Sequence, residues 1–157
     1  MSYLKAKHLS ELLVSKGLTI SVAESCTGGS LSSSLTSISG ASSYFNCGFI
    51  TYSNQSKIDM LGVKPESIEM FGAVSEKVAH EMVVGAGQKS HSNLAVSITG
   101  IAGPSGGSAA KPVGMVCIGF FFDGEVTTTT QFFSGSRSDI VSQSNAYALV
   151  ELSSQLS

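Results

Sequence analysis

The chain carries little charge for its length. Only 13% of its 157 residues are Asp, Glu, Lys or Arg, and the formal net charge is −2. No run of basic residues occurs, which argues against nucleic-acid binding through an electrostatic footprint. Low charge combined with many Ser, Gly and Ala residues indicates a tightly packed protein rather than a disordered one. It is also compatible with a homo-oligomer.

Cysteine, long apolar runs and clustered metal ligands are scarce as well. The three cysteines, Cys26, Cys47 and Cys117, are odd in number and widely spaced, which is typical of reduced, packed thiols in a cytosolic protein. The N-terminus lacks the apolar core of a signal peptide, and no apolar run approaches the ~20 residues that cross a bilayer. We therefore expect a soluble, cytoplasmic protein with no membrane partner. No cluster of His, Cys and carboxylates suggests a metal, and no organic cofactor is expected.

Strand-like and helix-like segments alternate along the chain. The length favours one domain over residues 1–157. Periodicity and capping residues predict one helix over 3–16 and a second that follows the turn at 24–29 and ends near 38. Three more helices are predicted to start near 53, 65 and 75. A last helix is predicted from about 136 to 156. Strands are predicted at 18–23, 45–52 and 94–98, followed by a hairpin over 115–133 that turns at Asp123-Gly124. This order predicts an α/β fold, a three-layer α/β/α domain with a mixed sheet.

Three strand-end loops are rich in small polar residues. The turn at 24–29 contains Ser25, Thr27, Gly28 and Gly29, and its glycines would let a ligand approach the backbone closely. The alternative is that Ser25 or Thr27 caps the following helix. Cys26 could be a nucleophile in principle, although no His neighbours it in the sequence. In open α/β sheets such loops meet at one edge, where ligands bind.

The most Gly-rich segment spans residues 99–108, and Arg137 begins the last helix. The segment lacks the Gly-Lys-Ser/Thr ending of a phosphate-binding P-loop. It could form a nest of amides for an anion, or be a flexible connection. A cation at a helix N-terminus is not favoured by the helix dipole, which suggests that Arg137 binds an anion. The alternative for Arg137 is a salt bridge.

A serine nucleophile would need a base, and the histidines offer none. His8, His80 and His91 lie in no motif. A lysine kept neutral by burial can replace His. Residues 40–57 place Ser42, Tyr52 and Lys57 on connected elements, so Lys57 could activate Ser42 while Tyr52 relays or orients the proton. The alternative is that Ser42 ends a helix, Tyr52 packs in the core and Lys57 is solvated.

Six segments together resemble one family, the CinA C-terminal domain family, over nearly the whole chain. Any one of them is a weak signal, but all six occur in the order of the family. They are residues 24–29 (ESCTGG), 48–57 (GFITYSNQSK), 72–76 (GAVSE), 99–107 (TGIAGPSGG), 111–114 (KPVG) and 133–137 (FSGSR).

The resemblance implies hydrolysis of the carboxamide of nicotinamide mononucleotide to nicotinic acid mononucleotide and ammonia, without a cofactor. It implies a serine nucleophile assisted by a tyrosine and a lysine, and these roles match Ser42, Tyr52 and Lys57. The implied partner is a small nucleotide, with Arg137 as the phosphate contact. The residues expected to bind this substrate are Ser25, Thr27, Gly28, Gly29, Thr99, Gly100, Gly103, Gly106 and Arg137.

Two positions depart from the family pattern. Ser142 follows Val141 where a second arginine is common, and Met115 stands where a small residue such as Thr is common. Two other functions therefore stay open. One is a non-catalytic nucleotide-binding or interaction module of the same fold, and the other is a hydrolase acting on a different carboxamide.

Overall fold

The chain folds around a five-stranded mixed sheet. The structure, a computed structural model, describes residues 2–157. The strand order is β2-β1-β3-β4-β5. The first three of these run parallel to one another, and each of the last two is antiparallel to the strand before it. The strands are β1 (Ile20–Glu24), β2 (Phe45–Ile50), β3 (Leu94–Gly100), β4 (Met115–Phe122) and β5 (Glu125–Phe132).

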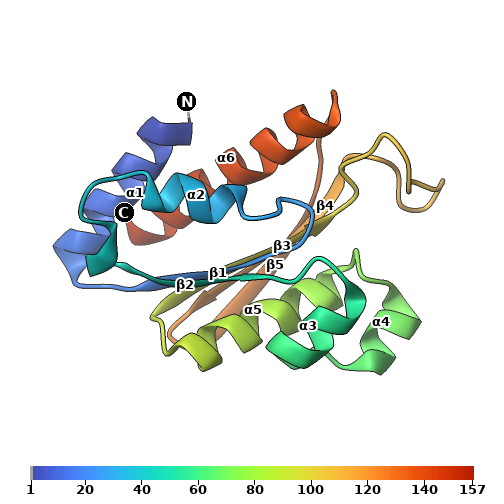
Figure 1. Cartoon of the computed structure of the whole chain (residues 1–157), viewed down its shortest axis with the longest axis horizontal. Coiled ribbons are helices and arrows are strands. Elements are labelled where there is room, and N and C mark those ends of the chain that lie inside the picture. Colours follow the sequence, from blue (N-terminus) through green and yellow to red (C-terminus); the bar gives the residue numbers. More distant parts are fainter. Residues whose placement is uncertain (1) are drawn as a thin grey trace.

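Helices cover both faces of the sheet, so the predicted three-layer α/β/α architecture is confirmed (Figure 1). One face is covered by α1 (Ser2–Lys16), α2 (Ser30–Thr36) and α6 (Arg137–Leu156). The other is covered by α3 (Asn54–Leu61), α4 (Pro65–Phe71) and α5 (Glu76–Ser90). A short 3-10 turn, η1 (Ala41–Ser43), precedes β2. None of the helices in residues 2–157 is both long and apolar enough to cross a membrane.

Serine N-caps set where two helices on the α5 side begin, as predicted. The Ser53 hydroxyl accepts the N–H of Ser56 at the start of α3, and the Ser75 hydroxyl accepts the N–H of Val78 at the start of α5. Each bond satisfies an N–H group that has no partner within its helix. Because α3 begins so soon after β2, Lys57 falls in its first turns, close to the carboxyl end of the sheet.

The helix after β1 is shorter than predicted and is not capped by Ser25 or Thr27. Its N-cap is Gly29, in a left-handed conformation (φ 101°), with no side-chain cap bond. Gly28 is also left-handed (φ 57°), a conformation that glycine adopts without steric cost. The alternative that Ser25 or Thr27 caps this helix is therefore wrong, and two of its first N–H groups donate to the Glu24 carboxylate instead.

Two apolar clusters, one on each face, hold the sheet between the helices. The larger packs α1, α2 and α6 on β1, β3 and β4, and includes Leu9, Ile20 and Leu149. The smaller packs α3 and α5 on the other face through residues such as Met82 and Val83. These rigid layers position the loops that leave the carboxyl ends of the parallel strands.

Candidate active site

The carboxyl ends of the three parallel strands meet at one edge of the sheet, as the sequence predicted. Glu24, the last residue of β1, pairs with Ile50 of β2 and with Ile98 of β3. The N–H of Ser25 then donates to the carbonyl of Ile98 (3.0 Å), and the N–H of Thr51 donates to the carbonyl of Glu24 (2.8 Å). The backbone around Ser25 is thus held by both neighbouring strands.

Lys57 of α3 reaches into this edge and contacts Ser25. Its side chain is buried, with only 1% of the residue exposed. The Nζ atom lies 2.9 Å from the Ser25 hydroxyl, 2.8 Å from the Thr51 carbonyl oxygen and 3.2 Å from the Tyr52 carbonyl oxygen. No salt-bridge partner of Lys57 lies within residues 2–157. The alternative of a solvated lysine is thus wrong, and Lys57 is buried.

The three contacts of Lys57 suit a neutral amine acting as a base. Carbonyl oxygens only accept hydrogen bonds, so the Thr51 and Tyr52 carbonyls each take one N–H of the amine. The third direction points at the Ser25 hydroxyl. In an ammonium this direction holds a third hydrogen, whereas in a neutral amine it holds the lone pair. The deprotonated lysine can therefore accept the Ser25 proton without moving.

Burial makes the neutral form of Lys57 accessible near neutral pH. It lowers the pKa of the ammonium from 10.5 to about 8, and the nearby Cys26 thiol opposes this shift only in part. Desolvation always disfavours the charged form of a lysine. With a pKa of about 8, roughly a tenth of the molecules carry a neutral Lys57 at pH 7.

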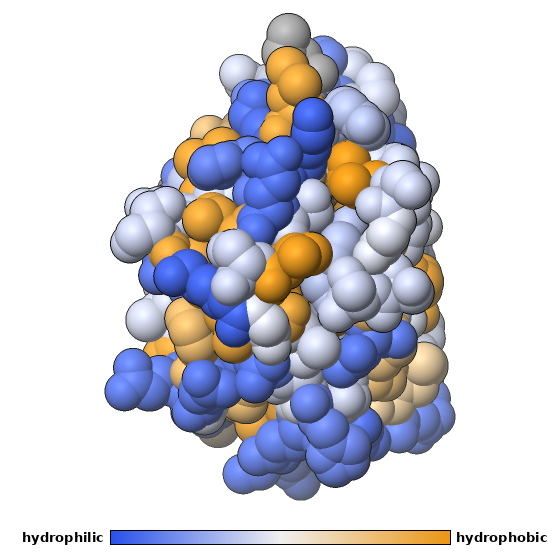
Figure 2. Space-filling model, turned by 90° about the vertical axis from the view of Figure 1, so that its left-hand side faces the viewer, coloured by the Kyte–Doolittle hydropathy of each residue, from blue (hydrophilic) through white to orange (hydrophobic). Residues whose placement is uncertain are grey.

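Ser42, expected to be the nucleophile, does not join Tyr52 and Lys57. It is exposed in η1, which lies before β2, whereas Lys57 lies after it. The intervening strand has six residues and spans roughly 16 Å at about 3.3 Å per residue. Figure 1 shows η1 and α3 at opposite ends of the sheet. Figure 2 shows the end of the molecule with η1, where small hydrophobic patches alternate with polar residues. The expected trio is not assembled because a strand separates its members.

Tyr52 lies at the site but in a different arrangement from the one expected. Its ring is exposed (58%) rather than packed in the core. Its carbonyl holds Lys57, while its hydroxyl accepts a 2.7 Å hydrogen bond from Arg137. The hydroxyl makes no hydrogen bond to Ser25 or Lys57 among residues 2–157, so the structure offers no proton relay through it.

Arg137 joins the last helix to the Gly-rich loop. Besides Tyr52, its guanidinium donates to the carbonyl of Gly103 (2.7 Å). Arg137 makes no salt bridge within residues 2–157, so the expected alternative of an ion pair is not realised there. Two of its five N–H groups are engaged, and the others remain for an anion.

A hollow of about 210 Å³ opens between these elements. It brings together four of the predicted binding residues with Tyr52 and Cys26. Thr99, also predicted, instead donates its hydroxyl to the Ala73 carbonyl (2.9 Å) and is buried. The lining residues are Cys26, Tyr52, Gly100, Ile101, Ala102, Gly103, Ser105, Gly106 and Arg137.

The 25–29 turn contributes one residue, Cys26, to the lining of this hollow. Burial raises the pKa of the Cys26 thiol to about 11, so the thiolate required of a cysteine nucleophile is scarce at neutral pH. Thr27 is buried and its hydroxyl has no partner within residues 2–157. Gly28 and Gly29 are the left-handed residues that turn the chain toward α2.

A larger hollow of about 760 Å³ lies elsewhere, along β5 and α6. Its rim carries the carboxylates of Asp123, Glu125 and Glu151, which would repel an anionic substrate. It contains no lysine, arginine or cysteine. The smaller hollow, which is lined by Arg137 and by Cys26 next to Ser25, is therefore the better candidate for the substrate.

Ser25 and Glu24 were not recognised from the sequence in the roles that the structure suggests. Ser25 was expected to bind substrate, and Glu24 was only one residue of a motif. The available signal was position, because Ser25 directly follows a buried strand whose parallel neighbour leads to Lys57. Only the pairing of β1 with β2 shows that these two side chains meet.

Comparison with known proteins confirms the resemblance. The sequence pattern of the CinA C-terminal domain matches residues 3–156. The chain belongs to the CinA C-terminal domain family. The segments quoted above from residue 24 to residue 137 all lie within the matched range.

Individual relatives agree with this assignment. The protein is 45% identical over 148 residues to the nicotinamide-nucleotide amidohydrolase PncC of Escherichia coli K12, covering 94% of this chain and 90% of that one. It is 57% identical over 113 residues to a CinA-like protein of Chloroherpeton thalassium, covering 72% of this chain. It spans only 34% and 27% of the lengths of two longer curated relatives, the latter being the CinA-like protein.

The solved structures agree with the fold. The crystal structure of a CinA superfamily protein from Klebsiella pneumoniae 700603 superposes with a TM-score of 0.97 at 29% identity, covering 99% of this chain and 98% of that chain. The architecture described above is thus that of the superfamily.

Proposed function

We propose that this protein hydrolyses the carboxamide of nicotinamide mononucleotide, giving nicotinic acid mononucleotide and ammonia, with Ser25 as nucleophile and Lys57 as base. The observation that carries the proposal is the 2.9 Å contact between Lys57 Nζ and the Ser25 hydroxyl, inside a buried site. The substrate is suggested by the name of the E. coli relative, which covers most of this chain.

The proposed chemistry proceeds in two halves. Neutral Lys57 takes the Ser25 proton as the serine oxygen bonds to the carboxamide carbon. The C–N bond then breaks, Lys57 returns the proton to the leaving nitrogen, and ammonia departs from an acyl-enzyme ester. In the second half a water attacks the ester and gives one proton to Lys57, which passes it to the Ser25 oxygen as the acyl C–O bond breaks. The acid that leaves then loses its remaining proton to solvent.

The amides next to Ser25 are suited to stabilise the oxyanion. The N–H of Thr27 donates to no acceptor in residues 2–157, and the N–H of Cys26 contacts only its own thiol. In hydrolases whose serine follows a strand, the N–H of the next residue commonly binds the oxyanion. One such donor lowers the barrier by about 3 kcal/mol. The left-handed Gly28 and Gly29 allow the tight turn that leaves these amides free.

The direct test is ammonia release from nicotinamide mononucleotide by the purified protein, with chromatography of the products. We expect ammonia and nicotinic acid mononucleotide in equal amounts. Tight nucleotide binding without ammonia would favour the non-catalytic module instead. Turnover of a different carboxamide, with none of the mononucleotide, would favour the other hydrolase.

Arg137 provides a test of the phosphate contact. Replacing it with Ala should lower kcat/KM for nicotinamide mononucleotide roughly 10- to 150-fold, the value of a charge-assisted hydrogen bond. The loss should be much smaller for nicotinamide riboside, which lacks the phosphate. The measurement is the ratio of kcat/KM for the two substrates in each variant.

Tyr52→Phe is the matched control for Arg137, because it removes the hydroxyl partner of the guanidinium and keeps its charge. It should preserve the preference for the phosphorylated substrate. An Arg137→Ala protein that keeps the full preference would show that the phosphate binds elsewhere.

Two expectations from the sequence, a homo-oligomer and a cytoplasmic location, stay predictions.

A further inference from the structure

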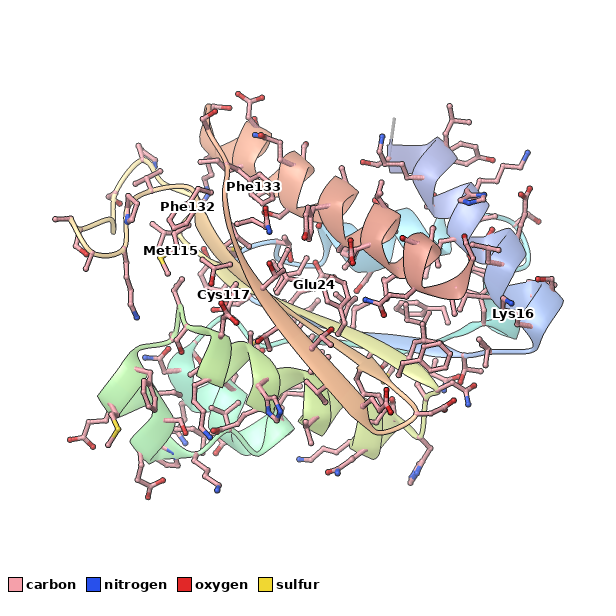
Figure 3. All side chains as sticks on the ribbon, turned by 180° about the vertical axis from the view of Figure 1, so that it is seen from behind. Lys16, Glu24, Met115, Cys117, Phe132 and Phe133 are labelled. Carbon is pink, nitrogen blue, oxygen red and sulfur yellow. The ribbon has the colours of Figure 1, made fainter. Side chains whose placement is uncertain are left out.

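Glu24 is a fully buried carboxylate held entirely by hydrogen bonds. It is 0% exposed, and Figure 3 shows it in the interior of the molecule. Its Oε1 accepts the N–H groups of Gly29 (3.1 Å) and Leu31 (3.0 Å). Its Oε2 accepts the N–H (2.8 Å) and the hydroxyl (2.6 Å) of Ser32.

These four hydrogen bonds use the full acceptor capacity of a carboxylate. Two carboxylate oxygens have about four acceptor sites, and four hydrogens point at them. A glutamine would turn an N–H group toward the Ser32 N–H and leave it without an acceptor. No Lys or Arg within residues 2–157 forms an ion pair with Glu24. Burying a carboxyl group is costly unless its hydrogen-bonding capacity is satisfied, and here the four donors of the turn and of α2 satisfy it.

The hydrogen bonds of Glu24 link Ser25 to the start of α2 and to the segment that holds Lys57. Its side chain binds the start of α2, its carbonyl accepts the Thr51 N–H from the segment that holds Lys57, and its own peptide bond leads directly to Ser25. The Thr51 carbonyl in turn accepts a hydrogen from Lys57 Nζ. A shift at Glu24 would therefore move Ser25 relative to Lys57.

We propose that Glu24 is a positioning residue for the amidase reaction. Its carboxylate fixes the 25–29 turn and the start of α2 so that the Ser25 hydroxyl faces Lys57. The inference rests on the proposed function. Glu24 contacts no substrate, because it lies wholly inside the protein. It acts through the turn, whose glycines would otherwise be free to adopt other conformations. Small displacements of reacting groups are sufficient to slow catalysis, since a shift of about 1 Å can cost roughly 10²-fold.

The test is Glu24→Gln beside Glu81→Gln. Glu81 is a matched control because its carboxylate also holds the start of a helix, accepting the Lys64 N–H (2.8 Å) and the Ser67 hydroxyl (2.6 Å), away from the site. Both variants should lose stability in urea. We expect Glu24→Gln alone to lower kcat by about 10²-fold with KM changed less than about threefold, and Glu81→Gln to keep wild-type kcat.

A second measurement follows the nucleophile without the substrate. The rate at which a fluorophosphonate labels Ser25, read by intact mass and peptide mapping, should fall in Glu24→Gln by about the same factor as kcat. If wild-type protein is labelled at Ser25 but releases no ammonia, the proposed substrate is refuted while the labelling rates still test Glu24. Equal labelling and kcat in wild type and Glu24→Gln, or equal losses in Glu81→Gln, would overturn the proposal.

Ser32→Ala keeps the test decisive if Glu24→Gln does not fold. It removes one of the four hydrogen bonds to the carboxylate and leaves the charge in place. We expect kcat and the labelling rate to fall together by roughly three- to tenfold, the value of one weakened hydrogen bond. Wild-type values for both rates would overturn the positioning role.

Discussion

Ser25→Ala should remove ammonia release from nicotinamide mononucleotide, lowering kcat by a factor of about 10³ or more. The serine is the only hydroxyl side chain in hydrogen-bond contact with Lys57 Nζ within residues 2–157. Alanine removes the oxygen that would bond to the carboxamide carbon. The fold should survive, because the N–H that joins Ser25 to Ile98 belongs to the backbone. The measurement is single-turnover ammonia release, together with circular dichroism.

Ser42→Ala is the matched control for this prediction. Ser42 is exposed in the middle of η1, at the other end of β2. We expect the Ser42→Ala protein to keep wild-type kcat and KM. Normal turnover by Ser25→Ala, with loss in Ser42→Ala, would instead restore the nucleophile that the family resemblance suggested from sequence.

Lys57→Met should abolish turnover, and wild-type turnover should depend on the ionisation of Lys57. The base must be neutral, and burial brings its pKa to about 8. Below that pH, kcat should therefore rise about tenfold per pH unit, and it should level off above it. Methionine retains the apolar stem but cannot accept a proton, so the loss should reach about 10³-fold. The measurement is kcat as a function of pH from 6 to 10.

The free energy of unfolding should also depend on the ionisation of Lys57, and it should rise with pH. In the unfolded chain Lys57 titrates near its ordinary 10.5, whereas in the fold its pKa is about 8. Between these values the unfolded chain binds more protons, so the contribution of Lys57 to the free energy of unfolding rises with pH. Below about pH 8 the cost of its buried charge is fully present. Lys57→Met should remove this pH dependence in urea melts.

Lys77→Ala is the control for both measurements, because Lys77 is half-exposed on α5 and pairs only weakly with Glu81. It should change neither the pH–rate profile nor the slope of stability between pH 8 and 10.5. A wild-type rate that is independent of pH from 6 to 9 would contradict a role for Lys57 as base.

The amino-acid sequence determined the architecture through local signals. Ser53 and Ser75 mark helix starts, Asp123-Gly124 marks the hairpin, and the apolar segments mark the strands. These signals act over a few residues, since caps and turns satisfy backbone groups close to them in the chain. The meeting of the loops after β1, β2 and β3 followed from the general behaviour of parallel strands. The motifs identified the family, now confirmed.

Tertiary structure alone decided which groups meet. Ser42 lies 15 positions before Lys57 and Ser25 lies 32 positions before it, so proximity in sequence favoured Ser42 as the partner of the lysine. Only the pairing of β1 with β2 brings Ser25 to the Lys57 amine. The pKa of Lys57 and the hydrogen bonds of Glu24 depend on burial and on donors brought together by folding. The sequence determines which side chains are present. It does not show directly which of them are desolvated or in contact, because both arise only when distant segments pack.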